Sequence, residues 1–141
     1  MNLAQIWRYP IKSHGSENLN SIDIHSGKTL PLDRTWAVVH DQSDADGSRW
    51  VPCRNFSRVA KAPQLAAIST TWTSDKKLEL SHPSIGKICI DPDLDSSKFI
   101  NWVSPLMPGN RAASVKLIRS VQTGMTDTDF PSISIGNLAS H

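Results

Sequence analysis

The run Thr35-Trp36-Ala37-Val38-Val39-His40 predicts a β-strand. β-Branched and aromatic residues dominate this run, and such residues favour the pleated, half-buried surface of a sheet. A second strand is predicted over residues 19–24, where Ile22 and Ile24 alternate with polar neighbours. Other short runs with strand character cover residues 3–9, 65–72, 78–81, 87–91 and 115–118. Short strands separated by turns therefore dominate the chain.

Two segments have helical character instead. Residues 55–61 fit a short helix with Asn55 as its cap, because Asn is a favoured N-cap residue. From Asp95 onward the pattern changes to helical spacing, with apolar residues at Phe99, Trp102, Val103 and Leu106. This spacing predicts a one-faced amphipathic helix that the following prolines terminate.

The pattern as a whole predicts an all-β protein, mainly β with one or two short helices. Residues 35–40 and 49–51 are expected to form a β-hairpin around a long polar loop. Several short strands at near-regular spacing, separated by turn residues, are typical of barrels. We therefore expect a partly open β-barrel of about six or seven strands.

Length and charge exclude several classes of protein. The chain has 141 residues, 38% of them hydrophobic, and a formal net charge of +2. This length suits one ordinary domain, and the small, scattered positive charge argues against nucleic acid as a partner. No apolar run approaches the roughly 18 residues of a membrane span. The N-terminus has no basic region followed by an apolar one, which favours a cytoplasmic location over secretion.

Generic motif searches assign no chemistry to the chain. Cys53 and Cys89 have no metal or redox spacing, so we expect two buried free thiols, with a disulfide as the alternative. The run Asp44-Ala45-Asp46-Gly47 lacks the remaining ligands of a calcium loop and is expected to be a polar loop tip. The histidines stand alone, as structural or solvated histidines usually do. The residues alone therefore assign no catalytic group and no metal ligand.

Two further motifs, taken together, are more specific than any of the generic motifs above. Tyr9-Pro10-Ile11-Lys12-Ser13 lies at a predicted strand end, and Leu32-Asp33-Arg34-Thr35-Trp36 leads into the clearest strand. This pair resembles the N-terminal β-barrel of the MOSC family, the molybdenum-cofactor sulfurase C-terminal domain proteins. In that family the first strand ends in Tyr-Pro-x-Lys-Ser, and a Gly-Asp-Arg-x-Trp run opens a later strand. Leu32 stands where the family usually has glycine.

The resemblance extends over most of the chain. Ala62-Pro63-Gln64-Leu65 resembles the family's step into its next strand, and residues 133–140 resemble the opening of the MOSC domain proper. It implies a MOSC N-terminal-like β-barrel domain over residues 1–118, followed by a linker and the truncated start of a MOSC domain over residues 119–141. We expect residues 120–129 to be an exposed loop and residues 132–135 to have strand character, with the last ten residues poorly ordered unless they pair with the sheet.

The resemblance also implies a cofactor site. It assigns binding of the molybdenum cofactor (molybdopterin) to Lys12, Ser13 and Arg34, with Asn137 added from the C-terminal segment. Such donors suit a phosphate, because Lys supplies a point charge, Ser a hydroxyl group and Arg a planar fork of donors. The alternative is that Lys12 and Arg34 are solvated strand ends and Ser13 is a turn residue.

The parent protein implied by the resemblance reduces N-hydroxylated compounds or carries sulfur. The family's molybdenum-ligating cysteine belongs to a part of the MOSC domain that this chain does not contain, so catalytic activity of the chain itself is left open. Pyridoxal phosphate binding enters only through the family's sulfurase members. The expected partners are the small-molecule cofactor and a redox partner protein, without nucleic acid or membrane.

A rival interpretation is a non-catalytic barrel that binds a protein or peptide through exposed tryptophans. The chain has five Trp, and Trp is favoured at interfaces as well as in cores. Trp7, Trp36 and Trp102 lie in strand or helix patterns and are expected to pack in the core. Trp50 and Trp72 border turns, which makes them the interface candidates.

Overall fold

The computed structural model describes residues 4–121 and 125, and within them it contains seven strands and one α-helix. The strands are β1 (Ile6–Arg8), β2 (Glu17–Leu19), β3 (Trp36–His40), β4 (Ser69–Trp72), β5 (Leu78–His82), β6 (Gly86–Ile90) and β7 (Ser114–Arg119). The helix is α1 (Ser96–Val103), and three short 3₁₀ turns are η1 (Cys53–Asn55), η2 (Pro63–Ala67) and η3 (Ser104–Leu106). The prediction of a mainly β protein with short helices is confirmed.

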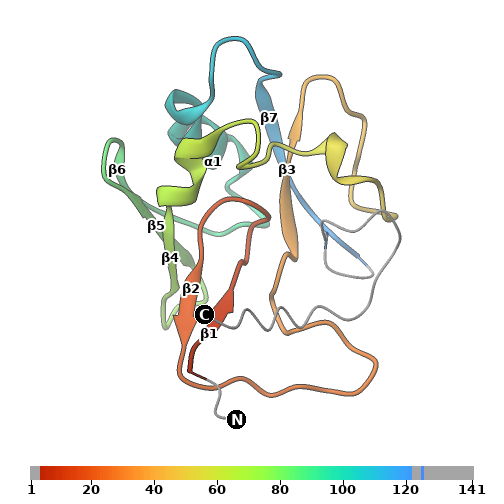
Figure 1. The fold of residues 1–141 in the computed structure, drawn as a ribbon, viewed down its shortest axis with the longest axis vertical. Helices are drawn as coiled ribbons and strands as arrows, with labels where there is room; N and C mark the ends of the chain where they lie inside the picture. The colour runs from red at the N-terminus through yellow and green to blue at the C-terminus, as the bar shows by residue number, and fades with distance from the viewer. Residues whose placement is uncertain (1–3, 122–124, 126–141) are drawn as a thin grey trace.

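The strands form three small antiparallel sheets, β1–β2, β3–β7 and β4–β5–β6. Two isolated bridges connect these sheets. Ile11 pairs in parallel with Trp36 and so joins the first hairpin to β3, while Ser16 pairs with Ser69 and joins it to β4. The strands therefore follow one another in the order β7, β3, β1, β2, β4, β5, β6 (Figure 1).

The helix α1 lies between the two ends of this series. It packs against both β7 and β6 (Figure 1). Phe99, Ile100 and Val103 form its buried face, and Leu106 in η3 continues that face. Pro105 lies two residues after the end of α1, inside η3, and its missing N–H ends the α-helical hydrogen bonding. The sheets do not close by hydrogen bonds alone, so the fold is the predicted partly open barrel, covered by a helix at its opening.

The strand β3 is buried on both of its faces. Trp36 and Val38 belong to the main core, which also contains the buried face of α1. Ala37 and Val39 belong to a second, smaller cluster with Phe56, Ile118 and Met125. A strand covered on both sides has a continuous apolar run rather than an alternating one, which explains why β3 was the clearest strand in the sequence.

Two strand predictions are wrong. The alternating segment 19–24 forms no strand beyond Leu19, and Ile24 is 76% exposed. Leu19 pairs with Ile6, the first residue of β1, and no described strand pairs with the residues that follow Leu19. The predicted hairpin of residues 35–40 with 49–51 is absent too, because β3 pairs with the distant β7 instead. An alternating pattern of apolar and polar residues forms a strand only where a partner strand lies beside it.

The short helix predicted over residues 55–61 is also wrong. Its place is taken by η1, whose last residue is Asn55, so Asn55 lies at the end of this turn and is not an N-cap. Phe56 then makes an antiparallel bridge to Val39. Pairing with β3 therefore requires an extended backbone where local propensity favoured a helix.

The cysteines and tryptophans differ in part from expectation. Both cysteines are free, but Cys53 is only half-buried and Cys89 is exposed. Trp36 and Trp102 pack in the core as expected, whereas Trp7 is 47% exposed, contrary to expectation. Trp72, predicted to be an interface residue, packs against Trp36 instead, with 5.7 Å between the ring centroids.

Some expectations fall on residues outside the described part of the chain. These are the strand at 132–135, the order of the last ten residues, and Asn137. Within the expected exposed loop 120–129, Met125 is described, and it is buried in the second core cluster rather than exposed. No helix of the described residues has the length and apolar character needed to span a bilayer.

Candidate functional site

The two motifs of the sequence lie side by side. Their backbones form three hydrogen bonds: Arg34 N–H to Tyr9 C=O at 2.6 Å, Trp36 N–H to Pro10 C=O at 3.1 Å, and Lys12 N–H to Trp36 C=O at 2.8 Å. Residues 9–12 therefore run parallel to residues 34–36, although more than twenty positions separate them in the sequence. The barrel brings the two motifs to one place on the molecule.

Lys12 and Ser13 form the centre of a tight turn. The amide of His14 donates to the carbonyl of Ile11 at 3.0 Å, and Ser13 has a φ of +62°. A positive φ at the third position defines a type II turn, where glycine is the usual residue. Ser13 is half-buried, whereas Lys12 is fully buried. The alternative that Lys12 is a solvated strand end is therefore wrong.

A second type II turn precedes Arg34. The amide of Asp33 donates to the carbonyl of Leu30 at 3.0 Å, Pro31 occupies the second position, and Leu32 has a φ of +61°. Proline suits the second position of this turn and glycine suits the third. Leu32 therefore adopts the backbone conformation that the family's usual glycine would adopt without strain.

Arg34 is held from several directions. Its φ is +47°, and its carbonyl accepts a hydrogen bond from the amide of Met125 at 2.9 Å. Its Nη1 donates to Oδ2 of Asp33 at 2.5 Å, and its guanidinium carbon lies 5.4 Å from the centroid of the Tyr9 ring. The Arg34 side chain is 16% exposed, so part of it reaches the surface.

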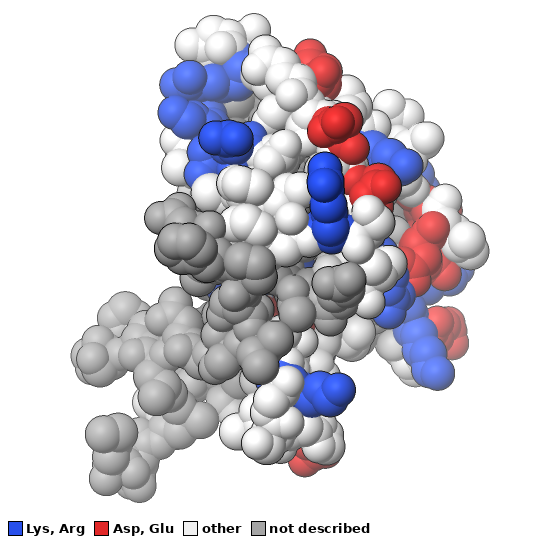
Figure 2. All heavy atoms as spheres, turned by 90° about the vertical axis from the view of Figure 1, so that its right-hand side faces the viewer, with Lys and Arg blue, Asp and Glu red and all other residues white. Residues whose placement is uncertain are grey.

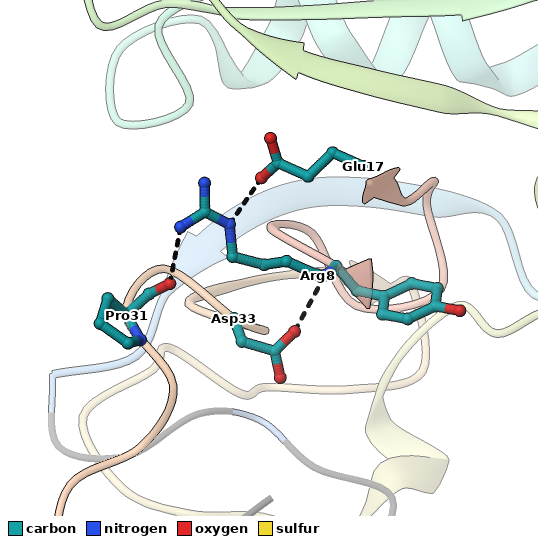
Figure 3. Close-up of polar contacts among 5 residues, drawn as sticks. Arg8, Glu17, Pro31 and Asp33 are labelled. Atoms are coloured by element: carbon teal, nitrogen blue, oxygen red, sulfur yellow. Dashed lines mark hydrogen bonds and ion pairs between the residues drawn. The ribbon is translucent and has the colours of Figure 1, made fainter. Parts of the chain in front are cut away.

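Arg8 holds the second turn against the first hairpin. Its Nε donates to Glu17 Oε1 at 2.6 Å, and its Nη1 donates to the carbonyl of Pro31 at 3.0 Å (Figure 3). Asp33, the last residue of the second turn, also holds that turn in place, since its Oδ1 accepts the amide hydrogen of Tyr9 at 2.9 Å. The Arg8–Glu17 pair is largely buried, and such a pair stabilises little by itself but is costly to break. These contacts fix where the turn lies.

His14 lies under the first turn as a neutral ring. Burial lowers its pKa to about 4, and a hydrogen bond with the Lys12 carbonyl only partly opposes this effect. The carbonyl can only accept, so Nδ1 carries the proton and donates to it at 2.7 Å. The ring also meets Phe99 edge-on, with 5.7 Å between centroids. His14 therefore connects the motif turn to the helix α1.

A second arginine has contacts like those of Arg34. Arg119 Nη1 donates to Asp93 Oδ2 at 2.7 Å, and its guanidinium carbon lies 5.1 Å from the Trp36 ring. Asp93 Oδ1 accepts from the indole N–H of Trp36 at 2.8 Å. This unit is more exposed than the Asp33–Arg34 pair, and it provides a natural comparison for experiments.

The polar loop around Asp44 and Asp46 forms a depression of about 390 Å³, lined by Asp44, Ala45, Asp46, Ser48, Arg49 and Val51. Hydrogen bonds from the Ser48 hydroxyl and amide lower the pKa of the Asp46 carboxyl. No group of three metal-ligating side chains occurs among the described residues. In Figure 2, acidic and basic side chains are interspersed over the right-hand part of the face shown.

Sequence reasoning identified the two motifs but missed the residues that fix their geometry. These are Arg8, Glu17 and the buried carboxylate of Asp33. A signal for the first pair was present, because Arg8 and Glu17 are directly opposite each other in the β1–β2 register and opposite charges are favourable there. Aligning residues 6–8 with 17–19 as a hairpin would have revealed it.

Comparison with known proteins identifies the family. The family model described as the MOSC N-terminal beta barrel domain matches residues 1–106 of the 141-residue chain. The chain therefore belongs to the MOSC N-terminal β-barrel domain family. No curated protein and no solved structure matches it.

Proposed function

We propose that this chain is a molybdenum-cofactor-binding module of a MOSC protein, in which Ser13 and Arg34 bind the phosphate of the molybdopterin. Membership of the MOSC N-terminal barrel family supports the general assignment. The backbone of the two motifs supports the particular residues. Of the four described non-glycine residues with positive φ, three are Ser13, Leu32 and Arg34. Such conformations are costly and cluster at ligand-binding sites.

The donor groups suit an oxyanion. Among the described residues, no hydrogen bond engages the Ser13 hydroxyl or the Nε and Nη2 atoms of Arg34. Lys12 is fully buried, so the proposal rests on Ser13 and Arg34 rather than on its amino group. When bound, the molybdenum centre supplies the redox chemistry, and the residues of this chain bind and orient the cofactor's phosphate.

Calorimetric titration with phenyl phosphate tests the proposal. At low ionic strength the chain should bind this monoester, and added salt should weaken binding because a partly exposed site is screened. Arg34→Lys should weaken binding about tenfold or more, since a point charge cannot reproduce the planar fork. Ser13→Gly should also weaken it, while retaining the turn conformation.

Arg119→Lys is the matched control, because Arg119 has the same kinds of contact with an aspartate and an aromatic ring. It should bind phenyl phosphate like the unmodified chain. Equal losses in Arg34→Lys and Arg119→Lys would contradict the proposal. Absence of binding at low salt would do so as well, and would favour a barrel that binds a protein partner instead.

A further inference from the structure

The carboxylate of Asp33 is buried, and both of its oxygens are engaged. Only 3% of the residue is exposed. Oδ1 accepts from the Tyr9 amide at 2.9 Å, and Oδ2 accepts from Arg34 Nη1 at 2.5 Å (Figure 3 shows the first of these). One side chain therefore fixes the Tyr9 backbone and the Arg34 guanidinium together.

The contact with Asp33 selects one edge of the Arg34 guanidinium. It uses Nη1, while the ring of Tyr9 lies against the guanidinium group. The Nε and Nη2 atoms make no hydrogen bond to any described residue. These two atoms form the side-on edge of the guanidinium, which can donate two parallel hydrogen bonds to one oxyanion. This edge, which can donate two hydrogen bonds to one anion, is therefore available to a ligand.

We infer that Asp33 is a positioning residue, which holds Arg34 so that its Nε/Nη2 edge is presented to the cofactor's phosphate. This inference rests on the proposed function for its ligand. A long arginine side chain loses considerable conformational entropy when it is ordered on binding. Ordering it beforehand removes that loss from the binding step, which is the usual benefit of a preorganised site.

The charge of Asp33 also has an opposing effect. A carboxylate beside Arg34 cancels part of its positive charge and repels an incoming phosphate. If this effect dominated, removing the charge would tighten phosphate binding. If positioning dominates, removing the charge will weaken binding and make the Arg34 side chain mobile. The two effects therefore predict opposite signs for the same substitution.

Asp33→Asn separates them, because its amide oxygen can still accept from the Tyr9 N–H while the charge is lost. We expect the NMR order parameter of the Arg34 Nε–H bond to fall from about 0.85 to below about 0.6, and phenyl phosphate to bind about tenfold more weakly. Asp93→Asn is the control, since Asp93 likewise accepts from an N–H and from an arginine Nη1. It should change neither the Arg34 order parameter nor the affinity.

The order parameter is measured without ligand, so it distinguishes this inference from the proposed function. A rigid Arg34 that becomes mobile in Asp33→Asn supports positioning even if the unmodified chain binds no phosphate, in which case the proposed function alone fails. An Arg34 that is equally ordered in both chains overturns the inference. Tighter phosphate binding by Asp33→Asn would also overturn it.

Discussion

Leu32 occupies a backbone position that suits glycine. Its φ of +61° places it in the left-handed region, which costs a residue with a Cβ about 1–2 kcal/mol. Glycine removes this strain and adds about 0.5–1 kcal/mol of unfolded-state entropy. Because Leu32 is 37% exposed, its replacement loses only part of a buried side chain. Leu32→Gly should therefore leave stability unchanged or slightly raised in urea unfolding.

Leu94 provides the comparison for this substitution. It is 80% exposed and does not have a positive φ. Leu94→Gly should lower the free energy of unfolding by about 1 kcal/mol, because glycine is entropically costly at an ordinary backbone position. Equal effects of the two substitutions would show that the turn at Leu32 is not strained.

His14 makes stability depend on pH. Its pKa is about 4 in the folded chain and near 6.5 in the unfolded one. Between these values the unfolded state binds a proton that the folded state does not, so stability falls as pH is lowered. The full contribution is present above pH 6.5, and about 3 kcal/mol is lost by pH 4, at about 1.4 kcal/mol per pH unit.

His14→Asn tests this dependence, because its amide can still donate to the Lys12 carbonyl but does not titrate. The free energy of unfolding, measured in urea from pH 7 to pH 4, should fall less steeply in this variant than in the unmodified chain. His25 is exposed, so His25→Asn should keep the original slope. An identical slope in all three chains would contradict the assignment of His14 as a buried neutral ring.

At the scale of single residues, the sequence identifies the motif residues but not their environments. The motif predicts Lys12 to be a phosphate donor or a solvated strand end, yet the residue is fully buried. Burial depends on what packs over the turn, and neighbouring residues in the sequence do not show this. The positive φ of Ser13 belongs to the tight turn after residues 9–12, and that of Arg34 lies where residues 34–36 pair with that segment.

The helix α1 is the element that the sequence predicted best. Phe99 is fully buried on its inner face, in contact with the rings of His14 and Trp102. Phe99→Ala should lower the free energy of unfolding by about 3–5 kcal/mol through lost burial and the cavity left behind. Asn101 is exposed on the same helix, so Asn101→Ala should change stability by no more than about 0.5 kcal/mol. Similar effects at both positions would contradict the assigned face.

Strands were predictable where the local pattern matched their burial. β5 alternates between buried and half-buried residues, and β3 is apolar throughout because both its faces are covered. The errors at 19–24 and 49–51 have a different origin. A strand needs a partner, and β3 finds its partner in β7, more than seventy residues later in the chain. Local patterns carry no signal for that choice.

At the scale of the whole molecule, β7 completes the barrel beyond the family match. The matched region ends at residue 106, but β7 pairs with β3 along its length and packs against α1. In β7, Leu117 belongs to the main core cluster and Ile118 to the second one. A chain of residues 1–106 would leave β3 without its partner and expose both clusters.

We therefore predict that residues 1–106 show no cooperative thermal transition by circular dichroism. A chain of residues 1–125 keeps every described element and should unfold cooperatively, close to the full chain. Cooperative unfolding of residues 1–106 at a similar temperature would show that β7 is dispensable. That result would contradict the role of the β3–β7 pair in the core.

On the function proposed above, residues 9–13 and 33–36 form one anion-binding site. The most direct test is a ¹H–¹⁵N NMR titration of the 141-residue chain with phenyl phosphate at low ionic strength. We expect the largest shifts at the amides of Ser13 and Arg34 and at the Arg34 Nε–H, and we expect added salt to reverse them. Shifts confined to another region, such as the depression around Asp46, or no shifts at these groups, would contradict it.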